Sequence, residues 1–512
     1  MDIKKEMITV NEPVLKTNEK VLVSGDIIVP DVKSDMARIL KIDADAIVEG
    51  ASPVSGKLEV YGKIYITILY VPENDPKPVC SISTEMPFDT VIENDKITDN
   101  VKCVCTADVF NVEFNMLNSR KLSVKTVVDL AVRGVRKAEH EFVVSLDSEN
   151  FEASREEEKV YSLVCLKNNK FTAEEVLDFP TGKPSAVSLL KTDVKLLNYQ
   201  THIVTGKIVV KGLVESCSLY VSDEGKIEFV SHEIPFTEVI DADGVNEKCY
   251  CDLCLSLLPA ASSLRADSDG DMRLIGLEML FAAEIVCYEQ TDIQLISDCY
   301  SCTEGFDAVQ KSVTFEKLIH KEDVRHNLKG AMSIGESMPP VDTVYNLMVK
   351  PYVENITAGN GEAVVEGVCD CYVLYLSEKE TTPVCSAMGT IPFSFSVTNK
   401  DITPSAKANV CVQLASCSYN LSISGEIEIR AAFDAAVTIT EEYTKDFVSD
   451  IKESEESYEK RHGIIVYFVR KGDSLWKIAK RYRVCLKELK ELNKLENPDL
   501  IFPGQPILIP MP

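Results

Sequence analysis

Apolar and polar residues alternate with a period of two along short runs that cover much of the chain. Two clear examples are KIYITILYV at residues 63–71 and EIEIRAAF at residues 426–433. Such runs are rich in β-branched and aromatic residues, which favour strands. Turn-forming residues separate them, as in SDEGK at 222–226 and AGNGEA at 358–363. The pattern predicts a mainly β protein built from antiparallel strands.

This strand-rich region contains an internal repeat. Three segments each place a glycine seven residues before a Leu-Tyr pair, and a Pro-Phe pair follows the tyrosine 15 to 17 residues later. Shared offsets of this kind indicate repeated structural units. The repeat predicts three tandem antiparallel β-sandwich-like domains at residues 1–145, 146–300 and 301–440. The signature residues are Gly62, Leu69, Tyr70, Pro87 and Phe88; Gly212, Leu219, Tyr220, Pro235 and Phe236; and Gly367, Leu374, Tyr375, Pro392 and Phe393.

Three segments of this region are expected to depart from the strand pattern. ARILK at 37–41 and VSLLK at 187–191 are each expected to form one short helix. Residues 441–460 hold eight acidic residues and three lysines, with neither Gly nor Pro. A dense charge run is typical of a solvated helix or a flexible linker. We therefore expect an acidic linker at residues 441–463.

The last fifty residues combine strand and helix periodicity. IIVYFV at 464–469 and PILIP at 506–510 are predicted strands, and LKELKELN at 486–493 is a predicted helix. A first helix is predicted to follow the turn at Gly472. The order predicts a small βααβ domain at 464–512. The two helices would face its core with Leu475, Ile478, Ala479 and Tyr482, and with Leu486, Leu489 and Leu492.

The charge balance argues against two classes of partner. The net charge is −27 and the isoelectric point is about 4.8. Nucleic-acid binding needs a basic surface, and an anionic membrane surface also attracts basic segments. No run approaches the 18 apolar residues of a transmembrane helix, and MDIKKEMITVNEPVLK has no apolar signal region. These features predict a cytosolic protein.

The 17 cysteines are expected to be small buried thiols in a reducing compartment. Cys251 with Cys254, and Cys299 with Cys302, also have zinc-ribbon spacing. Matching strand-like runs in the other repeats carry cysteines too. We therefore favour buried strand thiols and expect no metal site.

No other segment predicts a catalytic or cofactor site. DSDGDMRLIGLE at 267–278 resembles a calcium loop, with Asp267, Asp269, Asp271 and Glu278 at ligand offsets. Met272 stands where such a loop needs glycine, so a hairpin turn is predicted instead. Phosphate loops, nucleophile elbows and metalloprotease motifs are absent from the sequence. We expect no enzyme activity and no cofactor.

The C-terminal segment closely resembles a LysM domain. The resemblance rests on Val469, Lys471, Gly472, Asp473, Ser474, Leu475, Trp476, Ile478, Ala479, Tyr482, Val484, Leu489, Leu492, Asn493, Asn497, Asp499, Leu500, Ile501, Pro503, Gly504, Gln505, Ile507, Ile509 and Pro510. LysM domains typically bind N-acetylglucosamine polymers in a shallow groove. The resemblance implies a groove lined by Gly472, Asp473, Ser474 and Leu475 on one side, and by Pro498, Asp499, Leu500 and Ile501 on the other.

Two residues depart from the LysM pattern. Arg483 stands at a turn where glycine is common, and Cys485 replaces the usual Ser or Thr cap of the second helix. Both departures concern the turn and the cap, and neither lies in the implied groove.

The only tryptophan of the chain lies in this segment. Trp476 sits at the flank of the apolar stripe of the first helix, beside Lys477, Lys480 and Arg481. Residues 464–512 have a net charge of +4, so the rest of the chain carries −31. Because Trp is enriched among interface anchors, these four residues form a predicted binding site for a protein partner with an acidic face. The alternative is that Trp476 only covers the edge of the core.

The order of β repeats followed by one LysM domain resembles the SPOCS-domain proteins of spore-forming clostridia. The resemblance implies a non-enzymatic scaffold in the mother-cell cytoplasm, which binds the coat ATPase SpoIVA through its LysM domain at the forespore surface. Other coat proteins are further expected partners. A rival interpretation is a glycan-binding protein retained on cortex or cell-wall polymer. A wall hydrolase anchored by LysM is a third interpretation, which lacks a recognisable catalytic motif.

Overall fold

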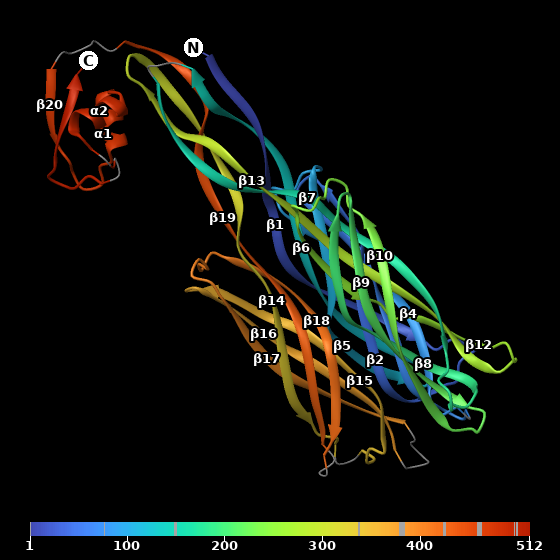
Figure 1. Ribbon diagram of the computed structural model, residues 1–512. Coiled ribbons are helices and arrows are strands. Elements are labelled where there is room, and N and C mark those ends of the chain that lie inside the picture. The colour runs from blue at the N-terminus through green and yellow to red at the C-terminus, as the bar shows by residue number, and fades with distance from the viewer. Residues whose placement is uncertain are drawn as a thin grey trace.

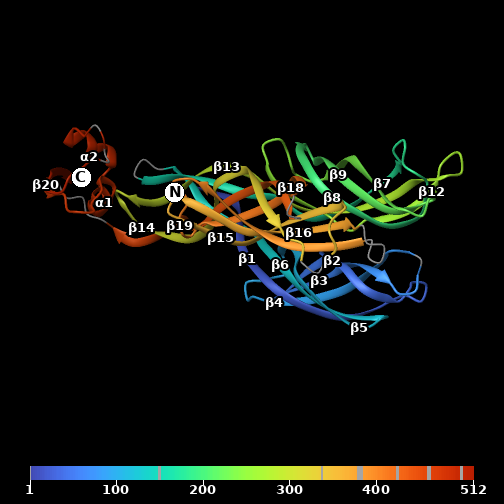
Figure 2. The same cartoon turned by 90° about the horizontal axis from the view of Figure 1, so that it is seen from below.

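The protein is described here by a computed structural model that covers residues 2–75, 77–147, 151–335, 338–377, 384–422, 426–457, 463–495, 497 and 500–511. The molecule is elongated, with most strands gathered toward one end and two short helices at the other (Figure 1). The N-terminus lies near the helical end (Figures 1 and 2). Among the described residues, no helix is long and apolar enough to cross a membrane.

The strands fall into three sets that contain the three sequence repeats. The first set is β1 (Asp2–Ile28), β2 (Met36–Val54), β3 (Lys57–Pro72), β4 (Cys80–Glu93), β5 (Val101–Asn118) and β6 (Lys121–Asp147). The second set is β7 (Phe151–Asp178), β8 (Ala186–Val204), β9 (Lys207–Ser222), β10 (Ile227–Asp241), β11 (Tyr250–Leu257), β12 (Ala261–Ala266) and β13 (Met272–Ser301). The third set is β14 (Glu304–Met332), β15 (Thr343–Gly359), β16 (Glu362–Leu376), β17 (Val384–Thr398), β18 (Lys407–Leu421) and β19 (Ile427–Ser457).

Each set forms two antiparallel sheets that enclose a common core. In the first set the sheets have the strand orders β2-β3-β4 and β1-β6-β5. The third set repeats this arrangement as β15-β16-β17 and β14-β19-β18. In the second set, β11 and β12 both pair with β13 and together take the place of one strand. The predicted mainly β fold with sandwich-like repeats is therefore confirmed.

The spacing that the three repeats share has a steric cause. Gly212 of β9 lies opposite Phe236 of β10. A Cβ atom on Gly212 would come within 2.5 Å of the Phe236 ring and 2.6 Å of the carbonyl oxygen of Asn198. Gly62 and Gly367 meet the equivalent phenylalanine and a neighbouring carbonyl in the same way. Only glycine lets the phenylalanine ring lie across the strand at these positions.

The signature tyrosines bind the loop between the first and second strands of each sandwich. The hydroxyl of Tyr70 donates to the carbonyl oxygen of Ser34 at 2.9 Å. Tyr220 and Tyr375 donate to the carbonyls of Pro184 and Pro339 at 3.2 and 3.0 Å. All three tyrosine side chains are fully buried. Each hydroxyl is therefore satisfied inside the protein, which removes the cost of burying it.

The expected short helices at 37–41 and 187–191 are wrong. Both segments are strands, in β2 and β8, and pair with β3 and β9. Bulges interrupt the register between Ile39 and Lys41 and between Leu189 and Lys191. Each bulge adds one residue to the strand, so the side chains no longer alternate with a strict period of two.

Three long ribbons continue beyond the sandwiches toward the helical end, and we call this bundle the stalk. The ribbons are β1 with β6, β7 with β13, and β14 with β19. All three contribute to a shared apolar core, so the stalk joins the three repeats. The core residues include Val10, Phe142, Val160, Leu295, Val313, Phe315 and Phe447.

The expected acidic linker is also wrong for residues 441–457, which form the last part of β19 and pair with β14. Phe447 and Val448 are fully buried in the stalk. Lys445 pairs with Glu156 and Glu158 of the neighbouring ribbon. Lys445 therefore lies on the polar side of a packed strand. Residues 458–462, also part of the expected linker, lie outside the described residues.

A buried polar network joins the three repeats. The Nζ atom of Lys191 lies 2.8 Å from Asp193 and 3.4 Å from Asp43. Lys41 pairs with Asp43 at 2.6 Å, and the amide of Asn346 donates to Asp193 at 2.9 Å. This network therefore contains residues from all three repeats. Each buried lysine faces a carboxylate, which offsets the cost of removing its charge from water.

The C-terminal domain has the predicted βααβ order. It consists of β20 (Gly463–Phe468), α1 (Leu475–Tyr482), α2 (Leu486–Asn493) and β21 (Pro506–Met511). The two strands pair antiparallel. Their core side chains pack with the apolar faces of the helices. The most buried core residues are Leu475, Ile478, Ala479, Leu489, Ile507 and Ile509.

Candidate partner-binding site in the C-terminal domain

The turn before α1 is held by hydrogen bonds within the domain. The Oδ2 atom of Asp473 accepts from the Tyr467 hydroxyl at 2.7 Å and from the backbone N–H of Arg470 at 2.8 Å. These bonds lower the pKa of Asp473, with the Tyr467 bond contributing most. Ser474 caps α1 by accepting from the N–H of Lys477. Much of the hydrogen-bonding capacity on this side of the implied groove is therefore used inside the domain.

The implied sugar groove stays a prediction. Leu475 is 2% exposed, so it belongs to the core rather than to an open groove surface. On the other side, Leu500 is 59% exposed and Ile501 is partly buried. Pro498 and Asp499 lie outside the described residues.

Trp476 contacts the stalk. Its Nε1 atom donates to Oδ2 of Asp298 at 2.9 Å, and its ring packs edge-on against Tyr300, with 5.1 Å between ring centroids. Lys480 pairs with the other carboxylate oxygen of Asp298. Asp298 and Tyr300 both belong to β13. Two of the four predicted partner-binding residues therefore bind the protein's own second repeat.

The other two predicted residues remain on the exposed side of α1. Lys477 donates to the carbonyl of Gly472, and Arg481 donates to the Tyr467 hydroxyl and lies over its ring. These contacts position the side chains but leave them exposed. Their role in partner binding stays a prediction.

The stalk also supplies the missing cap of α2. The side chain of Cys485 makes no capping bond to the helix. Oε1 of Glu152 in β7 accepts instead from the N–H of Leu486 at 3.0 Å. A carboxylate at a helix N-terminus also interacts favourably with the helix dipole. The Tyr300 hydroxyl adds a buried bond to the carbonyl of Val484 at 2.8 Å.

Sequence reasoning missed Asp298, Tyr300 and Glu152 as contacts of the C-terminal domain. Only Cys485 gave a signal, because a helix without its own cap needs a partner from elsewhere. Nothing in the local sequence of β7 or β13 indicates where those strands meet α1 and α2.

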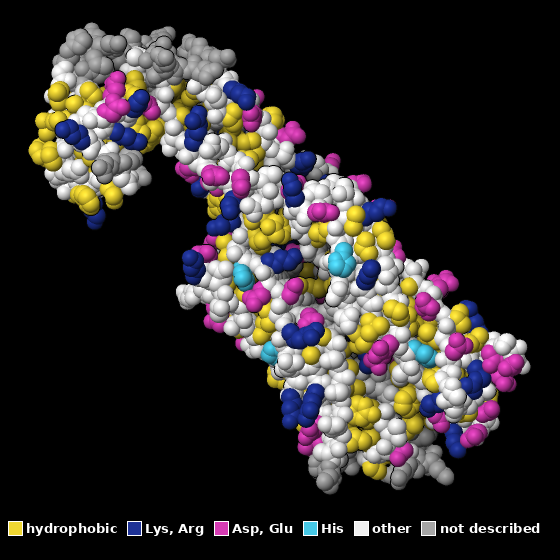
Figure 3. Space-filling model, viewed as in Figure 1, with side chains coloured by type: hydrophobic (Ala, Val, Ile, Leu, Met, Phe, Trp, Pro, Cys, Tyr) yellow, Lys and Arg dark blue, Asp and Glu magenta, His cyan; other side chains and the backbone are white. Residues whose placement is uncertain are grey.

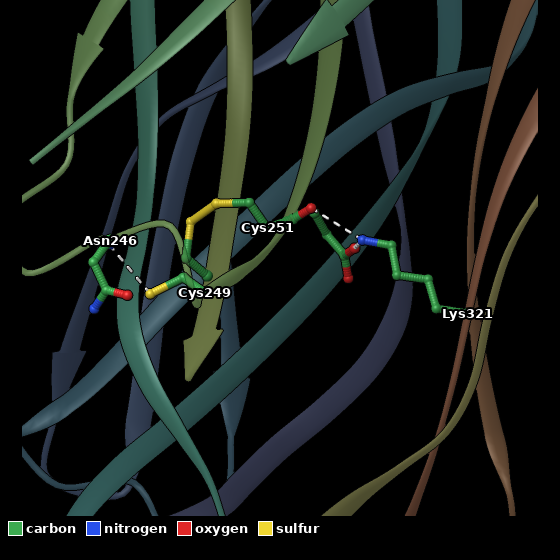
Figure 4. Close-up of a disulfide and its surroundings, with 6 residues drawn as sticks. Asn246, Cys249, Cys251 and Lys321 are labelled. Carbon is green, nitrogen blue, oxygen red and sulfur yellow. Dashed lines mark hydrogen bonds and ion pairs between the residues drawn. A yellow bond between two sulfur atoms is a disulfide. The ribbon is translucent and has the colours of Figure 1, made fainter. Parts of the chain in front are cut away.

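The expectation of free thiols is wrong for four cysteines. Cys251 forms a disulfide with Cys287 of β13, and Cys254 forms one with Cys411 of β18. The second bond links repeats two and three. Figure 4 shows the first bond beside Lys321, which donates to the carbonyl of Cys251. The other cysteines form no disulfide, and most of them are buried.

The other metal-like patterns also have local explanations. Cys299 and Cys302 lie on the stalk near the C-terminal domain, away from the disulfides. Oδ1 of Asp267 accepts from the N–H groups of Asp269 and Asp271, which makes the predicted hairpin turn between β12 and β13. Within the described part of the chain, no group of three potential ligands is positioned to hold a metal ion.

Two family models match the chain. The model described as "SipL, SPOCS domain" matches residues 35–117, 186–257 and 340–422, one stretch in each repeat. The LysM domain model matches residues 467–510. No solved structure matches the chain significantly.

The relatives resemble only a short part of the chain. SpoIVD-associated factor A of Bacillus subtilis (strain 168) is 56% identical over 46 residues, which is 9% of this chain and 12% of the relative. The spore coat assembly protein ExsA of Bacillus cereus is 54% identical over 46 residues, 9% of this chain and 7% of the relative. The uncharacterized protein YkzQ of Bacillus subtilis is 50% identical over 44 residues, 9% of this chain and 57% of the relative.

Proposed function

Because the chain is a SPOCS-domain protein that carries a C-terminal LysM domain, we propose that it is a non-enzymatic protein of spore coat assembly. The observation that carries this proposal is the combination of three SPOCS matches with a LysM domain. One similar protein is named as a SpoIVD-associated factor and another as a spore coat assembly protein, and both names support a structural role.

The specific partner we propose is the coat ATPase SpoIVA, bound through the LysM domain in the mother cell at the forespore surface. The LysM segment carries +4 while the rest of the chain carries −31, which favours a protein partner with an acidic face. The stalk would hold the LysM domain at one end of a rigid β scaffold. The surface predicted from the sequence, Trp476 with Lys477, Lys480 and Arg481, is one candidate for the contact.

Glycan binding by the LysM domain is the second candidate function. The LysM match itself favours it, because this domain class commonly binds N-acetylglucosamine polymers. The internal bonds of Asp473 and Ser474 favour a protein partner instead, since a sugar groove needs polar groups that are free to bind hydroxyls.

A binding comparison distinguishes the two functions. The full chain and a chain that ends at residue 461 are tested for binding to purified SpoIVA and for sedimentation with purified peptidoglycan. We expect the full chain to bind SpoIVA, the shortened chain to lose binding, and neither to sediment. Sedimentation of the full chain without SpoIVA binding would favour the glycan function.

A further inference from the structure

The LysM sheet has an apolar face that points to solvent. Ile464, Val466 and Phe468 alternate along β20 and are 62%, 52% and 61% exposed. Tyr467, on the other side of the strand, is only 8% exposed because it faces the helices. Side chains on the solvent side of a half-buried strand are usually polar. β20 therefore carries apolar residues on both sides.

The second strand extends this face. Leu508 lies opposite Val466 in the β20–β21 pair and is 37% exposed. Pro506 lies opposite Phe468. The paired segments 463–468 and 506–511 contain no charged residue. Figure 3 shows hydrophobic side chains on the side of the LysM domain that lies away from the rest of the molecule. A contiguous exposed apolar patch of this kind typically marks an interaction site.

The contacts with the stalk leave this face uncovered. They are made by Trp476 and Lys480 of α1 and by the start of α2. The helices pack on the opposite side of the sheet. Asn493 bonds both backbone groups of Leu508 and so covers the edge of β21 without covering its outer side chains. Among the described residues, the apolar face has no occupant.

The charges beside this face indicate the chemistry of its occupant. Arg470 and Lys471 follow β20 after the buried Val469 and are exposed. Lys471 has no partner among the ion pairs of the described residues, and Arg470 acts on Asp473 only at longer range, where it helps to lower the pKa of that carboxyl. A binding partner that places acidic residues beside an apolar segment would satisfy both the patch and these cations.

We propose that the apolar face formed by Ile464, Val466, Phe468 and Leu508 is the surface through which the LysM domain binds its protein partner, and that the partner contributes an apolar segment flanked by Asp or Glu. This inference rests on the proposed function and names its contact surface. Trp476 then holds the LysM domain on the stalk and presents the opposite face to the partner.

The test measures the affinity of the full chain for purified SpoIVA in four variants. The Val466→Thr/Phe468→Thr double variant removes apolar surface but keeps residues that favour strands. The Val187→Thr variant is the matched control, because Val187 is 67% exposed on β8, far from the LysM domain in sequence. The Trp476→Phe variant weakens only the stalk contact.

We expect the double variant to bind at least about tenfold more weakly, as for loss of central apolar anchors. The affinities of the Val187→Thr and Trp476→Phe variants should stay within about threefold of the native chain. Both substitutions lie outside the apolar face, and substitutions away from such features have small effects. An Arg470→Glu/Lys471→Glu variant should also bind more weakly and should show a smaller dependence on salt. Circular dichroism of each variant verifies that the domain is folded.

Each other outcome overturns the inference. If the double variant binds like the native chain while Trp476→Phe loses affinity, the partner binds the helical face, and the proposed function stands without this surface. If the native chain does not bind SpoIVA at all, both proposals fail. If the double variant changes only peptidoglycan sedimentation or only self-association, the occupant is a glycan or a second copy of the chain.

Discussion

The indole nitrogen of Trp476 donates a hydrogen bond to the carboxylate of Asp298, which lies 178 residues earlier in the chain. Lys480 binds the second oxygen of the same carboxylate, so one aspartate of the stalk holds two residues of α1. Charge-assisted bonds of this kind are stronger than neutral ones. This relationship makes Asp298 a central anchor of the LysM domain.

Replacing this carboxylate should loosen the domain. Because Trp476 is the only tryptophan, its fluorescence reports this contact alone. We expect Asp298→Ala to shift the emission to longer wavelength and to increase quenching by acrylamide, with a loss of about 1–3 kcal/mol from the contact. The Asp292→Ala variant is a control on the same strand. Unchanged emission and quenching in Asp298→Ala would show that the contact does not hold in solution.

The cap of α2 predicts coupling between β7 and the LysM domain. A serine at position 485 can cap the helix with its own hydroxyl, so Cys485→Ser should stabilise the LysM domain by about 0.5–1 kcal/mol. Glu152→Ala should destabilise the native chain by about 1 kcal/mol, because it removes the acceptor for the N–H of Leu486. In the Cys485→Ser background the same Glu152→Ala change should cost less.

A double-mutant cycle measures this coupling. Thermal unfolding followed by circular dichroism gives the stability of the four proteins. Strictly additive effects would mean that Glu152 does not act as the cap.

The signature glycine of the second repeat should not tolerate a side chain. In Gly212→Ala the added methyl group meets both the Phe236 ring and the carbonyl of Asn198. We expect a loss of stability of about 3 kcal/mol from this overpacking. A Gly212→Ala/Phe236→Leu variant should not recover fully, because the carbonyl remains close. Gly335→Ala serves as a control, since its nearest neighbour would be 3.9 Å away. A native melting temperature for Gly212→Ala would contradict the steric explanation of the repeat.

Glu284 predicts a pH dependence of stability. Burial, assisted by Asp252 and Asp108, raises the pKa of this carboxyl from 4.5 to about 7, while Arg133 opposes the shift. Between these values the folded state keeps a proton that the unfolded chain releases. Stability from this group therefore falls as the pH rises through that range and stays low above it.

Glu284→Gln removes this cost because the amide does not ionise. We expect the variant to be more stable than the native chain at pH 8, by up to about 3 kcal/mol, and equally stable near pH 4.5. Glu59→Gln, at an exposed glutamate, is the control. Melting temperatures at the two pH values check the prediction, and an equal effect of Glu284→Gln at both would contradict it.

The sequence by itself determined the features that depend on neighbouring residues. Period-two alternation indicated strands, and the repeated glycine, tyrosine and phenylalanine offsets indicated three related β domains. Helical periodicity around Leu475 and Leu489 indicated the LysM order. These signals are local, because side-chain direction along a strand or helix follows from backbone geometry alone.

Only the tertiary structure decided how distant segments use the same residues. Pairing with β3 makes residues 37–41, expected as a helix, part of β2, and a bulge hides their strand alternation. Packing against two other ribbons buries Phe447, so the acidic run around it forms a strand rather than a linker. The tertiary structure also showed that Trp476 binds Asp298 of the stalk, a contact within the chain rather than with a partner. Such outcomes depend on which surfaces meet in three dimensions, and neither spacing nor composition along the chain records that information.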